Sequence, residues 1–154
     1  MEIKEIGKVK QDNGAVYLEL LPEYQEGLVG LDDFSHLYVL YWFHHLDIPE
    51  LREATISKPY TNGPEKLGTF ATRGPLRPNP IALSAAKILK LQANKVYLDY
   101  LDAEEGSPIL DLKPYTPSSD VLENFQGPDW CQHWPQSYES SGDFDWAAEF
   151  NFTE

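Results

Sequence analysis

Residues 59–80 contain five prolines and three glycines. Proline removes a backbone donor and glycine weakens a helix, so a helix cannot cross this stretch. We expect an irregular loop here, in which residues 67–72 are the one segment that can form a strand. The chain on either side must therefore supply the regular elements of the fold.

On both sides of this loop, apolar and polar residues alternate in short segments. Residues 14–20 and 96–100 alternate with a period of two, which is typical of a half-buried strand. The run 37–43 is apolar on both faces and predicts a fully buried central strand. Segment 81–91 fits a helix or a strand, and further strand candidates are residues 3–10, 52–58 and 109–112. Short strands separated by Gly, Pro and Asn turns predict a mostly β fold, an antiparallel barrel or sandwich with few helices.

Composition excludes several classes of protein. The 154 residues are 42% hydrophobic and 13% aromatic, enough for the core of one domain, so a wholly disordered chain is excluded. A single cysteine rules out an internal disulfide and a cysteine-based zinc site. No apolar run approaches 18 residues, so we expect no membrane segment and a soluble, cytoplasmic protein.

Charge is distributed unevenly along the chain. The formal net charge is -13, yet the window 58–95 holds seven Lys and Arg against Glu65 alone. No Lys or Arg follows Lys113, and the segment 116–154 carries eight acidic residues. We therefore divide the chain into the β domain over residues 1–115 and an irregular, acidic and aromatic extension over 116–154. Its tryptophans should pack it on the β domain, away from Arg77 and Lys87, because exposing them all would leave a sticky surface.

The proline-rich loop also carries candidate functional groups. Arg73 and Arg77 are four residues apart between prolines and glycines, which makes a preorganised cationic surface suited to carboxylates and phosphates. Asn79 lies between two prolines and presents its amide from an extended backbone. Asp111 and Lys113 share one face of a strand, and parity alone does not decide whether that face is inward or outward.

The four histidines give little support for a metal site. His44 and His45 are adjacent, and neighbours in a strand point to opposite faces, so they should not bind one ion together. We therefore expect no metal.

Three motifs together resemble those of a known family. They are FATRGPLRPNPIALS at residues 70–84, LxGLxxFSHLYVLYWFH at 28–44 and LDAEEGSPILDLKPY at 101–115. In this order they resemble the TsaA/TrmO family of β-barrel, S-adenosylmethionine-dependent methyltransferases, over roughly residues 6–115. Longer members have a Pro-Arg-Gln loop between the first two strands and a separate C-terminal domain, whereas this chain has a short turn near residues 11–14 and the acidic extension.

The resemblance implies an activity and a set of site residues. The implied activity is N6-methylation of N6-threonylcarbamoyladenosine beside the anticodon of threonine-accepting tRNA, by a homodimer. The implied catalytic residues are Asp111, Arg77 and Asn79, with Arg77 and Lys113 contacting the substrate. The residues implied to bind S-adenosylmethionine are His44, His45, Arg73, Leu83, Ala103, Glu104, Glu105 and Gly106.

The chemistry required of such a site leaves several alternatives open. A methyl group moves in line from a sulfonium to a nitrogen, so positioning carries most of the rate. An N6 that bears a carbonyl group is a poor nucleophile, so Asp111 or a neutral His44 could accept its proton. A methyltransferase of a small molecule or another RNA, and a non-catalytic module that binds an adenosine ligand, are alternatives to the tRNA enzyme.

Overall fold

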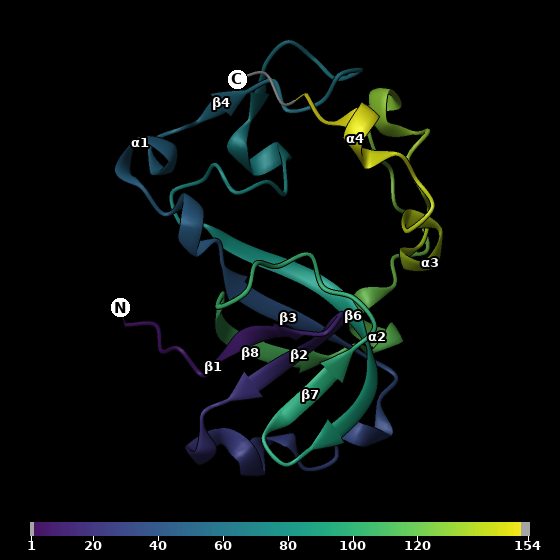
Figure 1. The fold of residues 1–154 in the computed structure, drawn as a ribbon. Coiled ribbons are helices and arrows are strands. Elements are labelled where there is room, and N and C mark those ends of the chain that lie inside the picture. Colours follow the sequence, from purple (N-terminus) through teal and green to yellow (C-terminus); the bar gives the residue numbers. More distant parts are fainter. Residues whose placement is uncertain (1, 152–154) are drawn as a thin grey trace. The chain divides into compact units, whose positions relative to one another are not determined.

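The computed structural model describes residues 2–151 and contains a closed antiparallel β-barrel (Figure 1). This confirms the mostly β prediction. The barrel strands are β1 (Gly7–Asp12), β2 (Ala15–Leu20), β3 (His36–Trp42), β6 (Ile81–Gln92), β7 (Lys95–Leu98) and β8 (Pro108–Pro114), closed in the order β1-β2-β7-β6-β3-β8. Contacts divide the chain into two compact units, a barrel unit of residues 2–47 and 80–121, and a second unit of residues 48–79 and 122–151.

Apolar side chains from alternate positions along the strands pack inside the barrel. Val9, Leu18, Val39, Val96 and Ile109 are fully buried and come from five different strands. Strand β3 was expected to be buried on both faces, and this is wrong, because it alternates between buried and half-buried residues. In a closed barrel a strand has one inner face, so its other apolar side chains lie on the outside.

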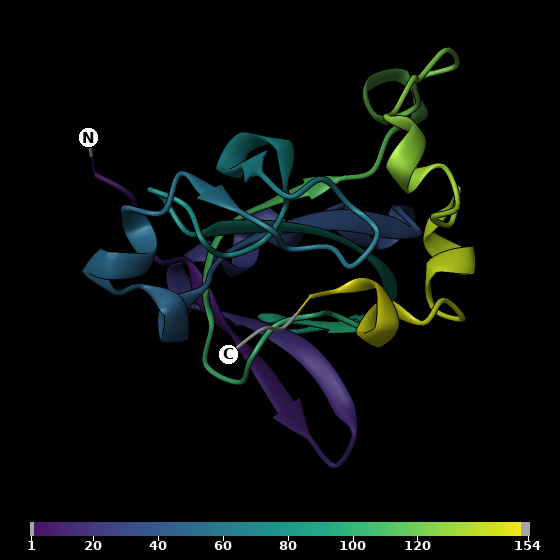
Figure 2. The same ribbon diagram turned by 90° about the horizontal axis from the view of Figure 1, so that it is seen from above.

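The hairpin between β1 and β2 depends on two residues with positive φ. Asn13 has φ 49° and Gly14 has φ 82°, and two such residues in succession give the tight turn that matches the twist of a hairpin. Figure 2 shows this hairpin in purple, extending from the rest of the barrel. Strand β1 begins four residues later than the sequence indicated, and the ambiguous segment 81–91 is the long strand β6.

A bulge in β8 fixes which way its polar residues point. Leu40 pairs with Asp111 but Tyr41 pairs with Ile109, so one extra residue, Leu110, is inserted in β8. Ile109 is buried, and the insertion puts Leu112 opposite the buried Val39. Asp111 and Lys113 therefore share the outer face of the barrel, which parity alone did not decide.

The remaining elements are short. The barrel unit also contains helix α2 (Pro117–Asp120) and 3-10 helices at Pro22–Leu28, Leu31–Asp33 and His44–Leu46. The helices of the second unit are α1 (Pro49–Arg52), α3 (Tyr138–Ser141), α4 (Trp146–Glu149) and 3-10 helices at Thr69–Ala71 and Asp129–Cys131. Its two-stranded sheet is formed by β4 (Ile56–Ser57) and β5 (Leu67–Gly68). The strands expected over 52–58 and 67–72 are thus reduced to two residues each. Within residues 2–151 no helix has the length and apolar character needed to cross a membrane.

The second unit is organised around Tyr60. This ring is 7% exposed, stacks on Trp130 with centroids 5.2 Å apart, and contacts Trp134 edge-on at 4.9 Å and Phe150 at 5.8 Å. Backbone bonds join the same segments, since Thr61 N donates to Glu149 O at 2.8 Å. The tryptophans of the acidic extension therefore pack on residues near Tyr60, and its packing on the barrel stays a prediction.

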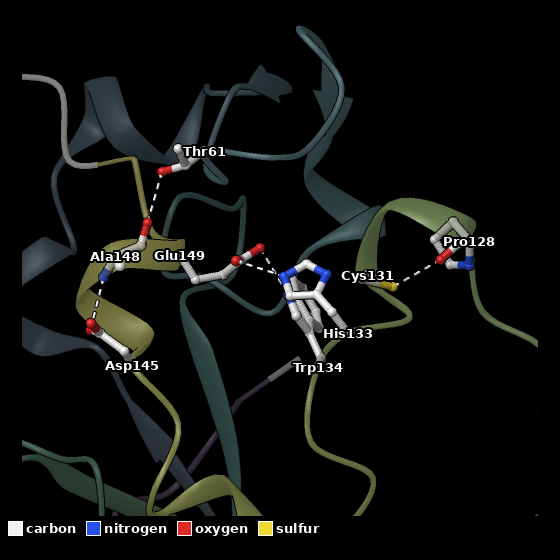
Figure 3. Close-up of polar contacts among 8 residues, drawn as sticks. All are labelled: Thr61, Pro128, Cys131, His133, Trp134, Asp145, Ala148 and Glu149. Carbon is white, nitrogen blue, oxygen red and sulfur yellow. Dashed lines mark hydrogen bonds and ion pairs between the residues drawn. The ribbon is translucent and has the colours of Figure 1, made fainter.

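A buried carboxylate joins helix α4 to the segment that contains His133 and Trp134, within the C-terminal part of the second unit (Figure 3). Glu149 is 4% exposed and accepts hydrogen bonds from Trp134 Nε1 at 2.8 Å and His133 Nε2 at 2.9 Å. Burial alone raises the pKa of Glu149, but the hydrogen bonds from His133 and Trp134 outweigh it and leave this pKa below its ordinary value.

The lowered pKa of Glu149 predicts acid sensitivity in the second unit. A depressed folded-state pKa contributes stability that is present above the ordinary value of 4.5 and is lost as the pH falls through the folded-state value. Glu149→Gln should destabilise this unit by about 1–3 kcal/mol at pH 7, because the donors of His133 and Trp134 lose a charged acceptor that is itself buried. Urea denaturation followed by tryptophan fluorescence measures this loss. Equal stability of both proteins at pH 7 would contradict the prediction, and Glu139→Gln, an exposed carboxylate in α3, is the control.

Candidate functional site

The loop after β7, residues 101–107, is fixed to strand β1 of the barrel by backbone hydrogen bonds. Gly106 N donates to Val9 O at 2.8 Å, and Val9 N donates to Ser107 O at 2.9 Å. Gly106 has φ 83°, a conformation that other residues rarely adopt, so glycine is needed for this turn. The predicted cofactor residues 103–106 thus form a well-defined loop.

Tyr41 holds the start of this loop from inside the barrel. Its ring is buried, and its hydroxyl donates to the backbone oxygen of Asp102 and lies 3.3 Å from Ser84 Oγ. The hydrogen bond joins residues sixty-one positions apart, so no local pattern in the sequence indicates it.

The β1–β2 hairpin holds the same loop from the other side. Gln11 Nε2 donates to Ala103 O at 3.0 Å, and Gln11 N donates to Glu105 Oε2 at 2.5 Å. Lys10 Nζ also contacts Glu105 Oε1 at 3.2 Å. The carboxylate of Glu105 is therefore directed at the hairpin, and it positions the loop. Sequence reasoning missed Lys10 and Gln11 because their contact is non-local.

The two adjacent histidines lie beside this loop. Strand β3 ends at Trp42, and His44 and His45 are in the 3-10 helix that follows, with ring centroids 3.8 Å apart. The expectation that their rings point to opposite faces is wrong, because they are not in a strand. His44 Nδ1 lies 3.2 Å from the hydroxyl of the buried Ser107. We call His44, His45, Ser107 and the loop 103–106 the mouth cluster.

Leu83 and Asp111 lie on the outer face of the barrel, one on each side of Leu40. Register places Leu83 opposite Leu40 on β6, and Asp111 opposite Leu40 on β8. Leu83 is 45% exposed, which leaves an apolar contact surface on this face. Lys113 Nζ contacts Asp111 Oδ2 at 2.8 Å, and the hydrogen bond to Asp111 raises the pKa of Lys113, so that the ammonium stays charged.

Asp111 also borders a cavity that the mouth cluster does not line. The cavity has a volume of about 510 Å³ and lies against the 3-10 helix Pro22–Leu28. None of His44, His45, Leu83 or residues 103–106 is among its lining residues. The candidates on the barrel therefore divide between the mouth cluster and the outer row of Leu83 and Asp111.

The remaining candidates belong to the second unit. Arg77 is half-buried and donates to three backbone oxygens of its own loop, those of Thr72 at 2.6 Å, Gly74 at 2.8 Å and Thr69 at 3.2 Å. Arg77 thus shapes the proline-rich loop, and its catalytic role stays a prediction. The side chains of Arg73 and Asn79 are exposed.

Tyr60 connects these arginines with the C-terminal segment. Burial raises the pKa of Tyr60, Cys131 and Glu149 add to the rise, and the positive charges of Arg73 and Arg77 oppose it. The extension was expected to pack away from Arg77, but it packs in the same unit, because Tyr60 precedes the arginine motif and supplies the aromatic anchor.

Metal ligation has no support from the side-chain arrangement. In residues 2–151 no group of three or more His, Cys, Asp or Glu side chains could hold an ion.

Comparison with known proteins identifies the family. A family model described as the tRNA-methyltransferase O N-terminal domain matches residues 7–121. The chain belongs to this family. The resemblance read from the three sequence motifs is thereby confirmed. The matched region includes the whole barrel, the mouth cluster and the arginine motif, and ends where the C-terminal part of the second unit begins.

Named relatives come from archaea and mammals. A probable S-adenosyl-L-methionine-binding protein of Pyrococcus horikoshii is 38% identical over 127 residues, covering 81% of this chain and 90% of that protein. A tRNA (adenine(37)-N6)-methyltransferase of Mus musculus is 41% identical over 103 residues, covering 65% of this chain and 23% of that protein.

The fold also matches solved structures of the family. The crystal structure of TrmO from Pseudomonas aeruginosa superposes with a TM-score of 0.63 at 28% identity. The match covers 82% of this chain and 60% of that one, so this chain spans less than two thirds of the solved protein.

Proposed function

We propose that this chain transfers a methyl group from S-adenosylmethionine to N6 of an adenine in tRNA. We further propose that this adenine carries the threonylcarbamoyl group and lies beside the anticodon. The observation that carries the proposal is the family match over residues 7–121, together with relatives whose names state S-adenosyl-L-methionine binding and tRNA (adenine(37)-N6) methylation.

The barrel residues suit such a cofactor. The mouth cluster offers two imidazole rings and the polar backbone of a fixed loop, and the exposed Leu83 offers an apolar contact. Adenosine needs both an apolar surface and hydrogen-bonding groups. S-adenosylmethionine supplies an activated methyl group on a sulfonium. The protein must orient the acceptor nitrogen in line and remove its proton.

We propose different tasks for the predicted binding residues. His45 and the backbone of Ala103, Glu104 and Gly106 are proposed to contact the cofactor, whereas Glu105 holds the loop against the hairpin. Arg73 and Asn79 stay predictions as cofactor and catalytic residues, and so do the homodimer and the cytoplasmic location.

Turnover on defined RNA tests the proposed function. The purified chain is incubated with S-adenosylmethionine and either tRNA carrying threonylcarbamoyladenosine or the same tRNA without that group, and the nucleosides are analysed by mass spectrometry. We expect N6-methylated threonylcarbamoyladenosine from the first tRNA and no product from the second. Methylation of both would contradict the proposed substrate, and binding without turnover would favour the adenosine-binding module.

Cofactor affinity tests the site. His45→Ala should weaken S-adenosylmethionine binding by about 1–3 kcal/mol in isothermal titration calorimetry, if the ring hydrogen-bonds a charged or buried ligand group. His36→Ala is the matched control, because it removes the same side chain at the opposite end of β3. Equal affinities of wild type and His45→Ala would remove His45 from the site.

A further inference from the structure

Four neighbouring strands of the barrel place two tyrosines between two lysines. Register puts Lys10 opposite Tyr17, Tyr17 opposite Tyr97, and Tyr97 opposite Lys90, across β1, β2, β7 and β6. These side chains point outward, because their chain neighbours Val9, Leu18 and Val96 are fully buried. We call Lys10, Tyr17, Tyr97 and Lys90 the tyrosine–lysine row.

The side chains of this row contact one another. The rings of Tyr17 and Tyr97 lie 5.1 Å apart with an interplanar angle of 31°. Lys90 Nζ lies 4.4 Å from the centre of the Tyr97 ring, and Lys95 Nζ, in the adjacent row, lies 4.8 Å from that of Tyr17. Adjacent strands are about 4.8 Å apart, so the row presents a continuous surface of aromatic rings and ammonium groups.

Positive charge gathers on this face in an acidic protein. The outward positions of the four strands carry five of the chain's twelve Lys and Arg, which are Lys8, Lys10, Lys87, Lys90 and Lys95. Two acidic residues, Asp12 and Glu19, share these positions, and Glu19 pairs with Lys95. Glu5 and Glu105 pair with Lys8 and Lys10 from outside the strands, so five lysines face four carboxylates, a local charge of +1 that leaves -14 for the rest of the chain. A single cross-strand pair would suffice to stabilise the sheet. A collection of lysines on one face is the footprint of a polyanion.

The aromatic rings decide which polyanion fits. Single-stranded RNA is recognised by stacking its unpaired bases on aromatic side chains while cations contact its phosphates. A peptide of Asp and Glu alone offers no ring to stack on the two adjacent tyrosines. The row also ends at the mouth cluster, since Lys10 Nζ contacts Glu105 Oε1 at 3.2 Å.

We propose that the tyrosine–lysine row binds the single-stranded loop of the RNA substrate. The tyrosine rings stack on bases and Lys90 contacts a phosphate, and the RNA extends past Lys10 to the mouth cluster. The assignment of a substrate rests on the proposed function, whereas the binding of RNA by the row can be measured independently of methyl transfer.

Binding of a labelled RNA hairpin with a single-stranded loop tests the proposal on the full chain. Fluorescence anisotropy is measured over a range of salt concentrations for wild type, Lys90→Gln, Tyr97→Leu and the control Lys4→Gln. Lys4 is exposed and precedes β1, so its variant removes the same charge outside the row. Lys90→Gln should weaken binding several-fold and reduce the salt slope by about 0.7, the value for one phosphate contact on a single strand.

Tyr97→Leu separates stacking from charge. It should weaken binding of the hairpin about tenfold, the order of one lost base stack, and leave binding of a fully paired RNA duplex nearly unchanged. Circular dichroism and calorimetry with S-adenosylmethionine, both expected to match wild type, show that each variant is folded. Hairpin affinities equal to wild type in both variants, or an equal loss in Lys4→Gln, would overturn the proposal.

Two further outcomes distinguish the sources of failure. Equal competition by a poly-glutamate peptide would overturn the assignment to RNA and indicate an acidic protein partner. A wild-type chain that binds the hairpin through the row but methylates no tRNA would contradict the proposed function and leave the row as an RNA-binding surface.

Discussion

Removing residues 122–154 should unfold the segment 48–79 and leave the barrel folded. The barrel closes through its own six strands, and among residues 2–151 its core cluster includes none beyond Val121. Residues 48–79 instead lose the ring partners of Tyr60 and the backbone hydrogen bond from Thr61 N to Glu149 O. Aromatic pairs contribute about 0.5–1.5 kcal/mol each beyond the area they bury, so losing several of them together removes most of the stability of a unit this small.

Hydrogen exchange with mass spectrometry measures this loss segment by segment. We expect peptides from residues 48–79 to exchange at the rate of an unfolded chain in the truncated protein, and peptides from β1, β3 and β6 to keep their protection. Leu122→Ala is the control, since it changes a side chain that is 74% exposed in the deleted segment. Full protection of residues 48–79 after truncation would show that the C-terminal segment is not their packing partner.

The truncation also has a functional consequence. The arginine motif with Arg73, Arg77 and Asn79 lies in residues 48–79, and Arg77 holds its loop by bonds to three backbone oxygens. When the loop unfolds, this arrangement is lost. If Arg73, Arg77 and Asn79 take part in the reaction, the truncated protein should lose methyl transfer activity together with the hydrogen-exchange protection of residues 48–79. Tighter RNA binding without any loss of protection would indicate instead that the acidic segment competes with RNA.

Local patterns predicted most of the barrel. Alternation identified β2 and β7, because every second residue of a barrel strand must be apolar. The motif resemblance identified the histidine pair and the loop 103–106, which the structure places together in the mouth cluster. Both kinds of inference use residues close together in the sequence.

What could not be predicted depends on contacts between distant residues. Asp111 points outward because one residue is inserted in β8, which moves the residues after it to the opposite face of the strand. The apolar residues Ile109 and Leu112 alone do not reveal this insertion in the sequence. The anchor of the acidic extension is Tyr60, about seventy residues before Trp130. The tyrosine–lysine row joins four strands whose pairing is known only from the register.

Replacing His44 should reduce the rate of methyl transfer more than replacing Asp111. The sequence left His44 and Asp111 open as alternative proton acceptors. The structure shows that the two side chains have different surroundings. Asp111 Oδ1 accepts from Leu112 N at 2.9 Å and Oδ2 contacts Lys113 Nζ at 2.8 Å, so both oxygens are engaged within its own strand. His44 belongs to the mouth cluster, where the proposed cofactor contacts lie.

The contact between His44 and Ser107 suits a proton acceptor. When Nδ1 carries the hydrogen and donates it to Ser107 Oγ, Nε2 keeps its lone pair and can accept a proton from N6. A neutral imidazole with a free ring nitrogen is the general base that enzymes use most often. Ser107 is buried, so it fixes the orientation of the ring.

Single-turnover rates on tRNA carrying threonylcarbamoyladenosine measure the difference. His44→Ala should lower the rate about 10²- to 10⁴-fold, the usual contribution of a general base, whereas Asp111→Asn should lower it less than tenfold. Ser107→Ala should have an intermediate effect, because the imidazole remains but loses the hydrogen bond that fixes its tautomer. Saturating S-adenosylmethionine separates these losses from weaker cofactor binding. A larger loss in Asp111→Asn than in His44→Ala would transfer the role of proton acceptor to the outer face of the barrel, beside Leu83.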